Sequence, residues 1–109
     1  MTVDALERLR ALCGGSRDGA LLRMSLAQAL LARGEREMAL AELRRALEFD
    51  PDYSAAWNQL GKLLAESGEA TAASEAYRNG IAAAQKRGDK QAEKEMRVFL
   101  KRLEEPARG

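Results

Sequence analysis

The chain repeats itself with a period of 34 residues, and this feature constrains its fold more than any other. A shift by one period superimposes like residues, namely Gly34 and Gly68, Ala39 and Ala73, Leu26 and Leu60, and Leu30 and Leu64. Within a period the apolar residues recur three and four positions apart, as in Leu40, Leu43 and Leu47, which is the spacing of a helix and not of a strand. The sequence therefore predicts repeated pairs of helices.

Single glycines mark the helix ends. They follow the apolar runs at Gly14 and Gly15, Gly34, Gly68 and Gly88. Glycine ends helices because it adopts the left-handed conformation without a steric penalty. We expect helices at about 3–13, 18–32, 36–48, 52–66, 70–86 and 89–104, with the helix boundaries uncertain by about three residues. Pro51 has its φ preset for a first helical turn, where its missing N–H is not needed, so Asp50-Pro51-Asp52 is expected to join the two repeats.

The residues at fixed positions of each repeat carry a resemblance to a known family. The second repeat has Trp57, Leu60, Gly61, Gly68, Ala73 and Tyr77, and the first has Leu26, Ala27, Gly34, Ala39, Leu43, Ala46 and Pro51. Their spacing, which includes W-x-x-L-G, resembles the tetratricopeptide repeat. The first repeat departs from it at Arg23, where the family favours a large apolar or aromatic residue. The whole chain also resembles small stand-alone bacterial proteins with two such repeats between single helices.

The resemblance implies an all-α fold, a right-handed α-solenoid of antiparallel helix pairs. We expect one domain over residues 1–109, with repeats at 20–53 and 54–87. Ala5, Leu9 and Leu12 lie one period before Ala39, Leu43 and Ala46, so residues 3–13 are expected to form a half-repeat that caps one end. Residues 105–109 are expected to form a frayed tail.

The last helix does not follow the strict period. A shift by 34 places the polar residues Gln91, Lys94 and Glu95 at buried positions. A slip of one residue instead turns an apolar set inward at helical spacing, consisting of Ala92, Met96, Phe99, Leu100 and Leu103. The helix at 89–104 is then expected to be the second cap, with a charged outer face that keeps the end soluble.

Composition excludes most chemistry. The chain has no histidine and one cysteine, Cys13, so it lacks imidazole catalysis, Cys-His pairs and disulfides. We expect no enzyme activity, no catalytic residues, no metal and no cofactor, and we expect Cys13 to act as a small buried hydrophobe. The net charge of +1 and the lack of a long apolar run argue against nucleic acid and membrane partners and favour a cytoplasmic protein.

A binding surface is implied by the resemblance, because the first helix of each tetratricopeptide repeat lines a concave groove. The expected groove residues are Leu21, Met24, Gln28, Leu31, Ala55, Asn58, Gln59 and Lys62. Leu21 and Leu31 have a second interpretation, in which they only pack against the capping helices. Some members of the family clamp a carboxylate with lysines and asparagines. Here the corresponding residues are Met24, Gln28 and Gln59 together with the possible basic contacts Lys90 and Lys94, so the first lysine is missing.

The leading hypothesis is an adaptor or co-chaperone-like scaffold that binds a short peptide or helix of a protein partner in this groove. The alternative is a structural subunit that self-associates or completes a larger assembly through its terminal helices. For that role the sequence offers Met96, Phe99 and Leu103 of the last helix. A monomer is favoured, and a homodimer stays open.

Overall fold

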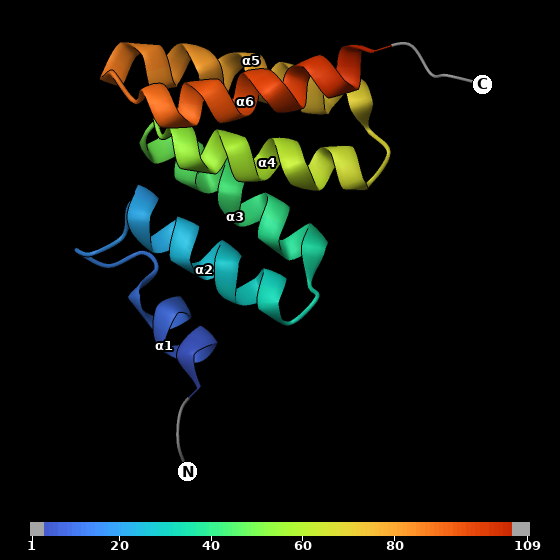
Figure 1. The fold of residues 1–109 in the computed structure, drawn as a ribbon. Coiled ribbons are helices and arrows are strands. Elements are labelled where there is room, and N and C mark those ends of the chain that lie inside the picture. Colours follow the sequence, from blue (N-terminus) through green and yellow to red (C-terminus); the bar gives the residue numbers. More distant parts are fainter. Residues whose placement is uncertain (1–3, 106–109) are drawn as a thin grey trace. The chain divides into compact units, whose positions relative to one another are not determined.

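The computed structural model describes residues 4–105, which form six α-helices and contain no strand (Figure 1). The helices are α1 (Ala5–Leu12), α2 (Ala20–Ala32), α3 (Arg36–Phe49), α4 (Ser54–Glu66), α5 (Ala70–Arg87) and α6 (Lys90–Glu104). Every predicted helix is present, and its ends lie within two residues of the prediction. The predicted start of the first helix at Val3 and the predicted frayed tail at 106–109 lie outside the described residues.

The chain divides into two compact units, one ending at Pro51 and the other beginning at Asp52. In the first unit α2 and α3 form a helix pair, joined by a turn at residues 33–35. The small side chains of Ala27 and Ala39 are fully buried and let the two helices approach closely. Leu26, Leu30 and Leu43 fill the remaining space. The eight-residue helix α1 lies against α2 and buries only Leu6.

In the second unit α4 and α5 form the corresponding pair, and α6 packs against both (Figure 1). The core cluster beneath α6 consists of Tyr77, Ile81, Ala84 and Met96, with Trp57, Ala92, Phe99, Leu100 and Leu103 packed around it. This set confirms the one-residue slip, because the five residues that the slip turned inward all contact the core. Trp57 of the W-x-x-L-G pattern also packs against this cluster.

Three of the helix junctions share one turn. Gly34, Gly68 and Gly88 have φ values of 75°, 81° and 71°, in the left-handed region that glycine was predicted to supply. The residue after each glycine donates its backbone N–H to a carbonyl near the end of the preceding helix, as Glu69 does to Leu64 at 2.9 Å. In each turn this residue is acidic, namely Glu35, Glu69 or Asp89, and it directly precedes the next helix. The same glycine-containing turn therefore reverses the chain direction at these three junctions.

Pro51 lies in the joint between the two repeats, as predicted, but not inside a helix. Because α3 ends at Phe49 and α4 begins at Ser54, Pro51 lies in the connecting turn and not in the first turn of α4. Its fixed φ suits that turn equally well.

Gly61 shows why the W-x-x-L-G pattern ends in glycine. A Cβ atom at this position would lie 2.6 Å from Cε1 of Tyr77 on the partner helix α5. Such a distance is far inside van der Waals contact, and the Tyr77 ring is buried. The close approach of α4 and α5 therefore depends on the missing side chain.

Candidate functional site

The predicted groove residues of α2 differ widely in exposure. Leu21 is 72% exposed, so it does not pack against a capping helix. Gln28 is exposed and Leu31 is half-buried. Met24, in contrast, is only 6% exposed and belongs to the buried core of the chain. On α2 the side chains open to a partner are therefore Leu21 and Gln28, with part of Leu31.

The predicted groove residues of α4 lie on a more polar surface. Ala55 is exposed, and Asn58, Gln59 and Lys62 are half-buried. Asn58 and Lys62 both contact Glu95 of α6. The sequence did not predict Glu95 as a groove residue. The structure brings these two predicted residues together around that carboxylate.

Glu95 is the centre of this polar cluster. Its Oε1 atom accepts a hydrogen bond from Nδ2 of Asn58 at 2.9 Å and lies 3.4 Å from Nζ of Lys62. The hydrogen bond from Asn58 and the nearby ammonium of Lys62 hold the pKa of Glu95 below its usual range, although partial burial opposes them. The carboxylate of Glu95 is therefore ionised at neutral pH. No spacing signal could have found Glu95, because its pairing depends on the rotation of α6 against α4.

An aromatic ring adjoins the cluster. Phe99 lies one helical turn beyond Glu95, and Nζ of Lys62 is 5.2 Å from the centre of its ring. The guanidinium of Arg102 is 6.0 Å from the same ring, and Tyr77 stacks on it at a tilt, 5.7 Å away. Cations over a ring face are attracted by its quadrupole. We call Asn58, Gln59, Lys62, Glu95 and Phe99 the α4–α6 surface.

One polar atom of this surface lacks a partner. The side-chain oxygen Oδ1 of Asn58 is buried and accepts no hydrogen bond from any described residue. Its amide nitrogen is the donor to Glu95, so the oxygen is directed away from that carboxylate.

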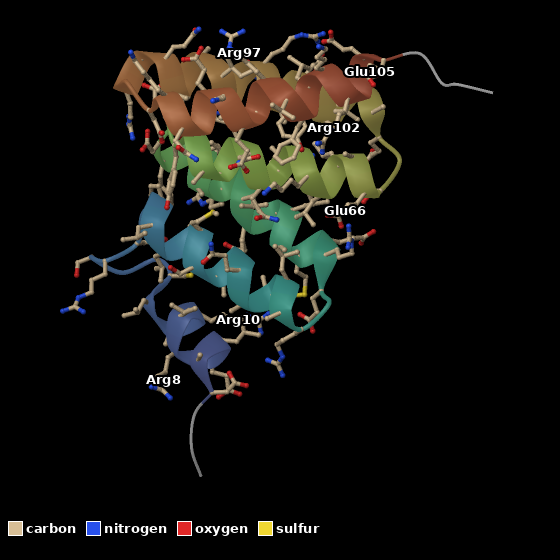
Figure 2. The ribbon with its side chains drawn as sticks, viewed as in Figure 1. Arg8, Arg10, Glu66, Arg97, Arg102 and Glu105 are labelled. Carbon is tan, nitrogen blue, oxygen red and sulfur yellow. The ribbon has the colours of Figure 1, made fainter. Side chains whose placement is uncertain are left out.

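The basic residues of the carboxylate-clamp interpretation lie elsewhere on α6. Lys90 and Lys94 are both exposed, and neither contacts the α4–α6 surface through an ion pair within residues 4–105. Arg97 and Arg102 leave α6 on different sides (Figure 2). The α6 helix therefore presents two distinct surfaces, one toward α4 and one outward.

In the first unit, Arg23 explains the departure from the family pattern. Its Nε and one terminal nitrogen donate to the two carboxylate oxygens of Asp18, at 2.9 Å and 2.8 Å. The other terminal nitrogen donates to Glu42 of α3 at 3.0 Å. The side chains of Asp18 and Arg23 are 9% and 14% exposed. Charge-assisted hydrogen bonds thus link the α1–α2 loop, α2 and α3, where the family uses an apolar side chain.

The first unit also has a shallow pocket of about 430 Å³ between α1 and α2, lined by Asp4, Ala5, Leu6, Ala29, Ala32 and Arg33. Asp4 accepts from the backbone N–H of Glu7 as the N-cap of α1, and its other oxygen pairs with Arg33 at 3.4 Å. The two charged side chains at its rim are thus engaged with each other. Cys13 lies near the end of α1 and is half-buried.

Other sites are not apparent in the described part of the chain. Within residues 4–105 no group of three histidine, cysteine or acidic side chains could hold a metal ion. None of the six described helices combines the length and apolar character that crossing a bilayer requires.

Comparison with known proteins identifies the repeats. Residues 27–68 match the family described as TPR repeat, and residues 54–87 match the tetratricopeptide repeat. A TPR repeat-containing protein of Pseudomonas aeruginosa is 43% identical over 104 residues, which are 95% of this chain and 96% of that protein.

Solved structures agree. A protein from Bordetella parapertussis has a TM-score of 0.77 and 44% identity, over 94% of this chain and 89% of that one. A tetratricopeptide repeat domain protein from Salinibacter ruber has a TM-score of 0.77 and 28% identity, over 85% of this chain and 95% of that one. The predicted all-α fold of paired helices is thereby confirmed. Such repeats generally mediate protein–protein interactions and serve as non-enzymatic scaffolds. This chain is a member of the tetratricopeptide repeat family.

Proposed function

We propose that this protein is an adaptor or scaffold that binds a short segment of a protein partner, and that the α4–α6 surface makes the principal contacts. The observation that carries the proposal is the half-exposed pair of Lys62 and Glu95 beside the ring of Phe99. It offers a cation, a carboxylate and an apolar face within one small area.

The Lys62–Glu95 pair is suited to exchange. Its 3.4 Å separation is longer than that of a strong charge-assisted hydrogen bond, and the two side chains are 39% and 41% exposed. Ion pairs at such exposure contribute little to folding stability, about 0–1 kcal/mol. A carboxylate of a partner can therefore recruit Lys62, and a basic group can recruit Glu95, at small cost to the fold.

The first unit has exposed residues of its own on α2. Leu21 offers a large apolar contact, and Gln28 offers an amide that can bond to a peptide backbone. Met24 is a poor choice for a test, because a charge at a residue 6% exposed would disturb the core.

The experiment begins with affinity capture of partners from the source cell and measures the affinity of the identified partner by calorimetry. We expect Lys62→Ala to weaken binding about tenfold or more, because a partly desolvated charged contact contributes about 1.5–3 kcal/mol. Lys86→Ala is the matched control, since Lys86 also forms one ion pair, with Asp52 at 2.9 Å, but on α5. Leu21→Ala tests the contribution of α2 without touching the core. Unchanged affinity in both Lys62→Ala and Leu21→Ala would refute the proposed surface.

Self-association through the apolar residues of the last helix receives less support. Met96 is fully buried, and Phe99 and Leu103 pack around it inside the second unit. The residues that the sequence offered for contact between copies are thus largely engaged in the core. Among the large apolar side chains of α6, Val98 is the one that is 45% exposed.

A further inference from the structure

The outer face of α6 carries a line of basic side chains. Lys90, Lys94, Arg97 and Lys101 are spaced four, three and four residues apart, and all four are exposed. At 3.6 residues per turn this spacing places them on one face of the helix, over a length of about 16 Å. Figure 2 shows Arg97 directed outward from α6. We call these four residues the basic stripe.

The stripe faces away from the core of the second unit. Met96, Leu100 and Leu103 contact that core, and they lie on the opposite side of the helix from the stripe. The stripe is therefore separate from the α4–α6 surface, to which α6 contributes Glu95 and Phe99.

Most of the charge on the stripe is not neutralised. Arg97 pairs with Glu93 at 2.9 Å, whereas Lys90, Lys94 and Lys101 form no ion pair among residues 4–105. Other basic residues of the second unit, such as Arg78 and Lys86, do have acidic partners. Solubility alone would be served as well by charges of both signs. The stripe has one counter-charge, Glu93, which pairs with Arg97 and attracts Lys90, and the remaining excess of positive charge favours an acidic partner.

We propose that the basic stripe binds an acidic helical segment of another protein, whose carboxylates repeat at the same four-three-four spacing. Two helices in parallel or antiparallel contact bring such rows into register, as at the charged edges of coiled coils. The exposed Val98 at the edge of the stripe supplies a small apolar contact.

Nucleic acid and membrane fit this surface less well. The stripe contains no aromatic side chain on which bases could stack, and the whole chain has a net charge of only +1. An interfacial membrane helix needs a broad apolar face opposite its charges, and on α6 that face is packed in the core.

The test measures binding of a fluorescent helical peptide whose glutamates repeat at the spacing of the stripe. A second peptide has the same composition, with its glutamates spread around the helix. We expect the patterned peptide to bind roughly tenfold more tightly, because only its carboxylates reach all four basic residues at once, and to weaken as salt rises toward about 150 mM.

Charge-reversal variants locate the site. The double variant Lys94→Glu and Lys101→Glu is expected to abolish the preference for the patterned peptide. Its control is Arg17→Glu with Arg44→Glu, which changes the net charge equally at exposed positions of the first unit. If the reversal also lowers helix content, Lys94→Gln with Lys101→Gln replaces it, with the preference again expected to fall.

Three results would overturn the proposal. They are equal affinity for the two peptides, a preference that survives the Lys94 and Lys101 variants, and tighter binding to duplex DNA or to vesicles of anionic lipid than to the patterned peptide. Loss of the Lys62 contact leaves this experiment unaffected, so the stripe and the α4–α6 surface are tested separately.

Discussion

Arg23 donates to Asp18 and to Glu42, and Asp18 also accepts a hydrogen bond from the backbone N–H of Gly14 at 2.8 Å. These bonds hold the pKa of Asp18 well below its usual range, with the hydrogen bonds from Arg23 as the largest cause. The same bonds raise the pKa of Arg23 further above its already high value. Asp18, Arg23 and Glu42 must therefore be present together, because the guanidinium of Arg23 pairs with both carboxylates.

This cluster predicts a specific dependence of stability on pH. A carboxyl whose pKa is lowered by folding stabilises the protein at any pH above its pKa in the unfolded chain, about 3.9. That contribution is lost as the pH falls through the pKa of the folded state. Asp18→Asn is therefore expected to lower Tm at pH 7, and its difference from the unmodified protein should shrink below about pH 4. Thermal unfolding followed by circular dichroism from neutral to acid pH measures this. Glu37→Gln, at an exposed site on α3, is the control. A difference in Tm that stays constant with pH would contradict the assignment.

Gly61 leads to a second prediction at the scale of single residues. A methyl group there meets the ring of Tyr77, so Gly61→Ala is expected to lower the free energy of unfolding by about 1–3 kcal/mol. Tyr77→Leu removes the ring and should make the two changes non-additive by at least about 0.5 kcal/mol. Urea denaturation of both single variants and the double variant measures the coupling. Additive losses would show that the ring is not the obstacle.

Among the elements, α6 contributes to both proposed surfaces and to the core. Its inward residues cover Tyr77 and Ile81 of α5, which would otherwise be open to water. The helix begins with Asp89, whose carboxylate accepts from the backbone N–H of Ala92 at 3.0 Å. It therefore has its own start signal and its own apolar face.

Met96 is the residue that fixes α6 to its unit. It is fully buried, and a Cβ atom at Gly80 on α5 would meet its sulfur. Met96→Ala is expected to lower the free energy of unfolding by about 2–5 kcal/mol, the usual loss for a buried methionine. Lys94→Ala, two residues away and exposed, should change it by less than about 0.5 kcal/mol. Chemical denaturation distinguishes them, and similar losses for both would mean that α6 is not held by this side chain.

The sequence predicted the helices and most of the core because both follow from local rules. Apolar spacing and glycine stops determine where α2 to α5 lie, and the inward set of α6 follows once its spacing replaces the strict period. The details of the site depend on contacts between helices. The burial of Met24, the pairing of Glu95 with Lys62 and the partners of Arg23 all require the rotation of one helix against another, which spacing does not encode.

At the scale of the whole molecule, burial is unevenly distributed among the helices. The eight-residue α1 buries only Leu6, whereas α5 buries residues along most of its length. Helices this short are marginal without tertiary contacts, so α1 should open more readily than the rest.

Hydrogen exchange measures this gradient. We expect the amides of α1 to exchange fastest among the six helices and those of α4 and α5 slowest. Leu6→Ala should remove the protection of α1 and leave that of α4 and α5 unchanged, since Leu6 belongs to the first unit. Protection of α1 equal to that of α5 would contradict this order.

The polar cluster around Arg23 has a consequence for protein engineering. A consensus design would replace Arg23 by the bulky apolar residue that the family favours, and would leave Asp18 and Glu42 with no cation to satisfy them. Such a redesign should instead exchange the three residues as one cassette for apolar side chains that fill the same space. The first helix pair would then tolerate the consensus substitution that no single replacement at Arg23 permits.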